Sequence, residues 1–431
     1  MKLYLDYNKL YKSIFIVVLL FLPIVFSYAQ TASDLQVQIG QKNADIDRLE
    51  QEIQAYQDQL NSIGKQKNSL AGSISELDLT RKKLVADISV TEKKIEKTNL
   101  KIQSLNKDIT HKKNSISNNT DAIVSGIKKV FDLENQSFIE NVLSKDDFTS
   151  IWVDVDNMIT VREKIIDQTR NLQVKKIELE DTRKDTLDAK NELLTLKSKL
   201  SDQRKIVEQN TKEKKQLLAY TKNNEANYQK LLSDSVLKKD ALEKELRDYE
   251  SKLVYILDPS KLPKAGIFSW PLDYIYITQL FGKTVDSKRL YASGSHGGVD
   301  FRASVGTPVK AMGNGVVAGV GDTDVQCFRT SFGKYIFIKY DNGLSAAYGH
   351  LSLVKMNIGD RVVTGQVVAY SGNTGYSTGP HLHVSLYAPG AAEVKSIPSK
   401  SCIGRVLTQP IAPINGYLDP MYYLPAYTKP K

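Results

Sequence analysis

Apolar side chains recur at every seventh position through much of the N-terminal half of this 431-residue chain. From residue 39 to residue 116, isoleucine and leucine dominate two companion series with the spacing of the a and d positions of a coiled coil. The pattern holds for about eleven heptads without a proline, well beyond the three or four that indicate a coiled coil. A patchier series runs from Met158 to Tyr249. The two series predict a long helical hairpin, while the apolar stripe alone equally allows pairing between two chains.

Breaks in the repeat, and a change of its period, set the expected boundaries. The polar run 117–121 indicates a helix break and restart, and Pro259 and Pro263 indicate a linker. Beyond the linker, apolar residues recur at every second position, which predicts short strands. The expected segments are a signal peptide over 1–29, a coiled-coil helix over 31–120, a helical elbow over 121–157, a second coiled-coil helix over 158–257, a linker over 258–266 and a β-rich domain over 267–431.

The expected fold class is therefore α+β and multidomain. A long α-helical coiled-coil hairpin precedes a β-rich antiparallel domain.

Four of the five histidines lie between residues 296 and 383, in three short polar clusters at 295–300, 348–351 and 379–383. Because alternate residues of a strand share a face, His381 and His383 should project on one side of a strand, opposite Leu382 and Val384. The same alternation aligns His296 with Asp300. A hydrolytic zinc site takes three such ligands and leaves one position for water, so the clusters predict a Zn²⁺ centre.

These clusters resemble the signature motifs of the LytM/lysostaphin-type zinc metallopeptidases, which cut the peptide part of bacterial peptidoglycan. The resemblance covers roughly 266–387 and resumes at 418–424. It implies that His296, Asp300 and His383 bind zinc. It further implies that His381 and His350 flank the bound water, with His381 as general base and His350 as hydrogen-bond partner of the developing oxyanion.

The long helical segment is similar to that of the EnvC-like murein hydrolase regulators, whose peptidase-like domain has lost ligands and only binds an amidase. This chain lacks none of the five expected site residues. We therefore expect an active peptidoglycan endopeptidase in wall remodelling or division. A non-catalytic activator that binds an amidase and a membrane division complex is the alternative. In either case the helical hairpin is expected to fold back and block the groove until a partner removes it.

Two departures from the family pattern stand out. Where the family often has an acidic residue after the His-x-His motif, this chain has Val384 and Ser385. It also carries two additional loops, over about 321–333 and 388–416, with one cysteine in each. We expect a disulfide between Cys327 and Cys402 that ties these loops together beside the groove, and two free thiols are the alternative.

The N-terminus has the pattern of an export signal. An apolar stretch over 13–26 follows a basic start, and small residues precede the bond after Ala29. The stretch is short for a membrane span, so we expect cleavage and export to the periplasm or the extracellular wall space; an uncleaved anchor is the alternative. The net charge of +10 is spread along the chain, which argues against nucleic acid and suits either a polyanionic wall or a merely solvated helical surface.

Overall fold

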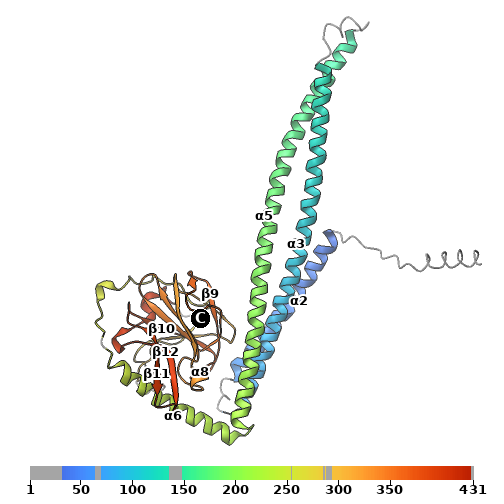
Figure 1. The fold of residues 1–431 in the computed structure, drawn as a ribbon. Coiled ribbons are helices and arrows are strands. Elements are labelled where there is room, and N and C mark those ends of the chain that lie inside the picture. Colours follow the sequence, from blue (N-terminus) through green and yellow to red (C-terminus); the bar gives the residue numbers. More distant parts are fainter. Residues whose placement is uncertain are drawn as a thin grey trace, which may run out of the picture. The chain divides into compact units, whose positions relative to one another are not determined.

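The computed structural model of the chain describes residues 32–63, 69–134, 148–253, 255–284, 287 and 294–428 (Figure 1). The predicted signal peptide and the centre of the predicted elbow lie outside these ranges. None of the helices within them combines the length and the apolar character that a membrane crossing requires. The fold class agrees with the expectation: long helices precede an antiparallel β-rich domain. The helices are α2 (Ala32–Ile63), α3 (Leu70–Glu134), α5 (Phe148–Thr221), α6 (Glu225–Glu250), α8 (Thr323–Gln326) and α9 (Pro420–Tyr423), with 3₁₀ turns η1 (Pro259–Lys261) and η2 (Ile414–Gly416).

The chain divides into two compact units, one of residues 1–43 and 96–192 and the other of residues 44–95 and 193–431. Helices α3 and α5 pair antiparallel within each unit. In the first, Lys112 Nζ donates to Thr182 Oγ1 at 2.8 Å. In the second, Lys214 Nζ lies 2.6 Å from Asp78 Oδ1. The two long helices thus lie side by side within one chain, as the hairpin prediction requires.

The helix boundaries differ from the prediction at three places. The predicted restart at 117–121 is wrong, because α3 continues to Glu134. Its polar residues fit inside a helix: the Thr120 hydroxyl donates to the Ile116 carbonyl at 2.8 Å instead of capping a new helix. The first coiled-coil segment is two helices, α2 and α3, and Lys94 Nζ of α3 lies 3.1 Å from Glu50 Oε1 of α2.

The second coiled-coil segment also ends early. Helix α5 stops at Thr221, and Lys222 and Asn223 have φ of 50° and 53°, outside the helical region. Helix α6 then begins with Asn224 as its N-cap, whose side chain accepts a hydrogen bond from the Asn227 amide. The last part of the predicted coil is therefore a separate helix of 26 residues.

The β domain is built on an antiparallel central sheet with the strand order β1-β2-β10-β6-β5-β4-β8, in which β13 also pairs with β10. A three-stranded sheet, β3-β9-β7, and a hairpin, β11-β12, complete the strands of the described residues. Their bounds are β1 Ile277–Gln279, β2 Val299–Arg302, β3 Pro308–Lys310, β4 Gly315–Asp322, β5 Lys334–Tyr340, β6 Ser345–Gly349, β7 Leu351–Val354, β8 Arg361–Val362, β9 Val367–Ser371, β10 His381–Tyr387, β11 Glu393–Ser399, β12 Arg405–Ile411 and β13 Tyr417–Leu418.

The main core of the domain lies on one face of the central sheet. Val299 and Phe301 of β2 pack there with Leu382, Val384 and Leu386 of β10, all fully buried. These are the alternate residues that strand periodicity assigned to the core face. The other face of the same strands is left for the polar side chains of the site.

Candidate active site

The central sheet brings the three polar clusters together. On β10, His383 pairs with Asp300 of β2 on one side and with Gly349 of β6 on the other. His381 begins β10, His296 lies just before β2, and His350 follows the end of β6. All five predicted site residues therefore line one cavity of about 320 Å³.

His296, Asp300 and His383 form a compact group of potential metal-binding atoms. The distance between His383 Nδ1 and Asp300 Oδ1 is 2.8 Å, and that between His296 Nε2 and His383 Nδ1 is 3.1 Å. His296 Nε2 lies 3.3 Å from Asp300 Oδ1. All three residues are buried. The sheet thus holds two imidazole nitrogens and one carboxylate oxygen around one point.

Hydrogen bonds to the far side of each ring fix its orientation. The Leu280 carbonyl lies 3.0 Å from His296 Nδ1 and can only accept, so Nδ1 carries the hydrogen and Nε2 presents its lone pair. His383 Nε2 lies 2.8 Å from Ser385 Oγ, which leaves Nδ1 facing Asp300. Metal-ligating histidines characteristically donate their other ring nitrogen in this way.

The donor set fits a zinc ion. Ligand atoms about 2.0–2.1 Å from a tetrahedral zinc lie about 3.3 Å from each other, close to the separations of 2.8–3.3 Å between these three atoms. Burial would raise the pKa of Asp300, but hydrogen bonds from His296 and His383 lower it well below its usual range. Asp300 is therefore an anion at neutral pH.

Two further imidazoles face this group. The rings of His350 and His381 lie 4.5 Å apart between centroids, and His381 Nε2 lies 3.7 Å from Asp300 Oδ1. The Thr374 carbonyl accepts from His350 Nδ1 at 2.8 Å, and the Gly379 carbonyl accepts from His381 Nδ1 at 2.7 Å. Both rings consequently have an unprotonated Nε2 when neutral, so both act as proton acceptors.

Burial also keeps His350 and His383 neutral. It lowers the pKa of His350 well below its ordinary value, and the nearby His381 and His383 lower it further. Burial likewise lowers the pKa of His383, although Asp300 opposes this shift. Neutral imidazole is the form that binds a metal ion or takes a proton.

The site depends on close backbone packing at Gly298. A Cβ at this position would lie 2.3 Å from the Val384 carbonyl oxygen and 2.8 Å from the His383 ring. Glycine therefore lets β2 and β10 approach closely enough for Asp300 and His383 to meet.

Several parts of the site were not predicted from the sequence. The carbonyls of Leu280, Thr374 and Gly379 orient three of the rings, and backbone groups leave no signal in the sequence. Ser385 shares a strand face with His383 and was noted as a departure from the family pattern, so a signal for it existed. The wall that α6 contributes was not predicted at residue level.

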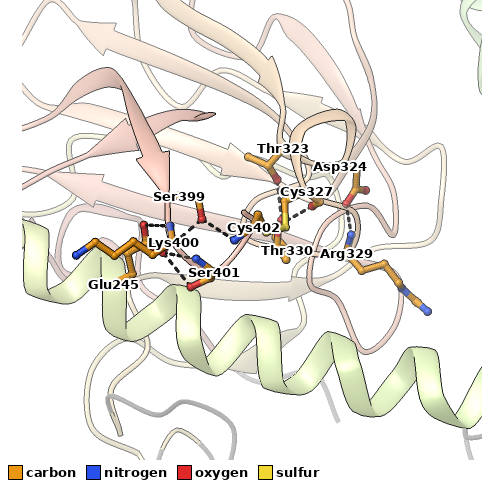
Figure 2. The surroundings of a disulfide bond; sticks show 10 residues. All are labelled: Glu245, Thr323, Asp324, Cys327, Arg329, Thr330, Ser399, Lys400, Ser401 and Cys402. Carbon is orange, nitrogen blue, oxygen red and sulfur yellow. Dashed lines mark hydrogen bonds between the residues drawn. A yellow bond between two sulfur atoms is a disulfide. The ribbon is translucent and has the colours of Figure 1, made fainter. Parts of the chain in front are cut away.

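The expected disulfide between Cys327 and Cys402 is present. Its Cα atoms are 6.1 Å apart, within the usual range. It joins the loop after α8 to the turn between β11 and β12 (Figure 2). The two additional loops are thus covalently linked.

Fold and site together define an antiparallel β domain with a buried His-Asp-His donor set. Residues 294–395 match the family described as Peptidase family M23. The glycyl-glycine endopeptidase ALE-1 of Staphylococcus capitis is 43% identical over 91 residues, which cover 21% of this chain and 24% of ALE-1. The DD-carboxypeptidase/endopeptidase Mpg of Neisseria meningitidis serogroup B is 36% identical over 120 residues, 28% of this chain and 26% of Mpg.

The matched region spans about a quarter of the length of these curated relatives. Among solved structures, the catalytic domain of lysostaphin from Staphylococcus simulans is 28% identical, with 34% of this chain and 90% of that chain covered and a TM-score of 0.25. The resemblance to the LytM/lysostaphin group that the motifs predicted is confirmed for this domain. The long N-terminal helices are consistent with an EnvC-like coiled coil.

Proposed function

We propose that this chain is an exported, zinc-dependent endopeptidase that hydrolyses peptide cross-links or stem peptides of peptidoglycan, with its helical segment in a regulatory role. The observation that carries the proposal is the completeness of the site. His296, Asp300 and His383 supply three converging donor atoms, and the imidazoles of His350 and His381 face them. A protein that only bound a partner would need none of this buried polar machinery.

In this proposal His296, Asp300 and His383 hold the zinc ion, which when bound acts as a Lewis acid and lowers the pKa of water. His381 Nε2 accepts a proton from the attacking water, because its Nδ1–H is committed to the Gly379 carbonyl. The resulting imidazolium carries that proton to the amine that leaves. The Gly379 carbonyl keeps the ring aimed at the site throughout.

The role of His350 follows from its tautomer. With Nδ1–H donated to the Thr374 carbonyl, neutral His350 has no hydrogen on Nε2. It therefore first accepts a hydrogen bond from the water and thereby orients it. Donation to the tetrahedral oxyanion would require a proton on Nε2, which burial of the ring disfavours. The resemblance implied only the second of these roles.

The test is digestion of purified peptidoglycan by the full chain, with the products identified by mass spectrometry. We expect new amine and carboxyl ends in the peptide part, complete loss of cleavage with a chelator, and its return with added zinc. His383→Ala should lose both bound zinc and activity. Cleavage by metal-free protein would contradict the proposal.

The same experiment separates the enzyme from the alternative, a non-catalytic activator. An activator would leave peptidoglycan intact at any zinc concentration and would raise the activity of an added amidase. The proposal also places the chain in the periplasm or the wall space, where its substrate lies and where the Cys327–Cys402 disulfide is stable. A membrane division complex is the expected partner of the helical segment.

A further inference from the structure

The ring of His350 is oriented by a peptide carbonyl. The Thr374 carbonyl accepts a hydrogen bond from His350 Nδ1 at 2.8 Å, and this bond leaves Nε2 as the ring nitrogen that can accept a proton. The Thr374 hydroxyl donates to the Leu351 carbonyl at 2.8 Å, so the same residue is also attached to the chain just after His350. The position of His350 Nε2 therefore depends on where the peptide group that follows Thr374 lies.

This peptide group makes a second contact, with a carboxylate. Its N–H belongs to Gly375 and donates to Asp324 Oδ2 at 2.7 Å. Because the peptide is trans and planar, its C=O and its N–H point in opposite directions. The Asp324 carboxylate and the His350 imidazole are therefore bound at the two ends of one rigid unit. A rotation of this unit that loosens one of the two hydrogen bonds also misdirects the other.

Asp324 belongs to the additional loop over about 321–333. Its other oxygen, Oδ1, accepts a hydrogen bond from the Arg329 amide of the same loop at 2.7 Å (Figure 2). Cys327 lies between these two residues in the chain, and its disulfide with Cys402 tethers the loop. The carboxylate thus bridges a covalently tethered loop and the peptide group that binds the imidazole.

The same loop also contacts the backbone of His350. The Phe332 carbonyl accepts a hydrogen bond from the His350 amide at 2.7 Å. The loop packs backbone against backbone on the segment that holds the ring, since a Cβ on Gly375 would lie 2.2 Å from the Gly333 nitrogen. His350 has a φ of 60°, a conformation that non-glycine residues seldom adopt and that surrounding contacts must hold. The loop therefore supports His350 through its backbone and through its ring.

The Asp324 carboxyl is mostly ionised above neutral pH. Burial raises its pKa to about 6 from an ordinary 3.8, although the Gly375 and Arg329 amides act in the opposite direction. A charged acceptor makes a stronger hydrogen bond than a neutral one, and a peptide group that donates to it becomes a stronger acceptor itself. The carboxylate should accordingly strengthen the hydrogen bond between the Thr374 carbonyl and His350.

We propose that Asp324 is a positioning residue for His350 and acts on it through the peptide group between Thr374 and Gly375. The carboxylate fixes the plane of this peptide and polarises its carbonyl. His350 Nε2 is thereby aimed at the attacking water and made a better hydrogen-bond acceptor. The inference rests on the proposed peptidase function, in which His350 orients that water. It gives the loop over about 321–333 a part in the reaction, although no residue of this loop is among the proposed zinc ligands.

The experiment compares the zinc-loaded full chain of the wild type with Asp324→Asn and Asp322→Asn at pH 8. Both variants lose one negative charge from the same loop. Asparagine has one side-chain oxygen, so at position 324 it cannot replace both oxygens of the carboxylate. At position 322 it can replace the aspartate, which caps α8 by accepting from the Asp324 amide at 3.1 Å. Asp324→Ser, whose side chain is too short to bridge both amides, serves the same purpose if Asp324→Asn does not fold.

Three properties of each protein are measured. Ring ¹⁵N–¹H spectra of histidine-labelled protein give the tautomer of His350 and the exchange of its Nδ1 proton with water, and His350→Gln assigns the signal by its absence. Hydrolysis of dye-labelled peptidoglycan gives the maximal rate and the half-saturating amount of substrate. Competition with a chromophoric chelator gives the zinc affinity.

We expect Asp324→Asn to lower the maximal rate about tenfold, since hydrogen bonds to a charged acceptor have roughly this effect on an equilibrium. The half-saturating amount and the zinc affinity should remain those of the wild type. The His350 Nδ1 proton should exchange faster, and the tautomer should shift toward the form with its hydrogen on Nε2. Asp322→Asn should match the wild type in every measurement.

A lower rate with an unchanged His350 spectrum would overturn the proposal, because Asp324 would then stabilise the loop without positioning the ring. An equal rate in all three proteins would also overturn it. If the wild type hydrolyses no peptidoglycan, the proposed function fails. The positioning of His350 is then judged by its ring spectrum, and it is overturned if Asp324→Asn leaves that spectrum unchanged.

Discussion

At the scale of single residues, Ser385 shows how a departure from the family pattern is accommodated. Its hydroxyl lies 2.8 Å from His383 Nε2, on the side of the ring away from Asp300. A neutral hydroxyl orients the ring as an acidic residue would, but it adds no negative charge. The Ser385 hydroxyl therefore fixes the orientation of the His383 ring, but it raises the basicity of that ring less than a carboxylate would.

Ser385→Ala should therefore lower zinc affinity by roughly 10- to 100-fold, the usual effect of removing a group that orients a ligand. Competition with a chromophoric chelator measures the affinity directly. Ser396→Ala, on β11 and away from the site, is the matched control. Equal zinc affinity in all three proteins would show that Ser385 does not orient His383.

Gly298 and Gly297 make a matched pair for testing backbone packing. An added Cβ at position 298 meets the Val384 carbonyl oxygen at 2.3 Å, whereas at position 297 it meets Tyr417 Cε1 at an ordinary 3.5 Å. Gly298→Ala should destabilise the β domain by about 1–3 kcal/mol, as overpacking does, and Gly297→Ala by much less. Thermal unfolding followed by near-ultraviolet circular dichroism measures both. Equal midpoints of thermal unfolding in the two variants would contradict the close approach of β2 and β10.

Strand alternation was sufficient to place His381, His383 and Ser385 on one face, because a strand's period of two is a local property. It could not give the conformation of His350, whose φ is 60°. This left-handed position arises where β6 passes into β7 and the chain changes sheets. Contacts between distant strands impose it, so no local pattern indicates it.

At the scale of elements, the heptads predicted long helices correctly but did not identify what each helix packs against. Leu242 and Tyr249 continue the heptad series of α5, yet they pack on the β11–β12 hairpin and its disulfide. A stripe of apolar residues shows that a helix face is buried and does not specify its partner. For the same reason the sequence did not separate α2 from α3.

Glu250 should make the attachment of α6 sensitive to pH. Burial raises its pKa to about 7 from an ordinary 4.5, although Tyr417, the Ala412 amide and Arg247 act in the opposite direction. The folded protein thus holds the proton more tightly than the unfolded chain. The stabilisation is complete below pH 4.5 and is lost as the pH rises through about 7.

We expect Glu250→Gln and the wild type to protect the α6 amides from hydrogen exchange equally at pH 5. At pH 8 the variant should protect them better, because it carries no buried charge. Comparing the two proteins at each pH cancels the intrinsic pH dependence of exchange. If the ratio of α6 amide protection in the variant to that in the wild type stays constant from pH 5 to pH 8, Glu250 does not titrate in this range.

At the scale of the whole molecule, charged pairs join the long helices within one chain. Lys214 with Asp78 and Arg204 with Glu92 connect α5 to α3, with separations of 2.6 Å and 2.9 Å. Exposed pairs of this kind add little stability, but they show which residues of α3 and α5 lie opposite each other. The apolar stripe had left pairing between two chains open, and these contacts favour the intrachain arrangement.

Cysteines at positions 78 and 214 test this arrangement. A short bismaleimide should join them within one chain, so that Asp78→Cys/Lys214→Cys gives a cross-linked product of monomer mass. Asp78→Cys alone provides the control, since it can form cross-links only between chains. Dimer-mass products from the double variant would instead support a coiled coil between two chains.

The short connection between α6 and the β domain has a kinetic consequence. A segment joined to its own binding site by a short flexible linker is present there at an effective concentration on the order of millimolar, whatever the concentration of the protein. A soluble molecule at a lower concentration would then compete poorly with α6 for this surface of the β domain, and dilution would not detach the helix. Detachment of α6 is therefore governed by the strength of its own contacts with the β11–β12 hairpin and not by the concentration of the protein.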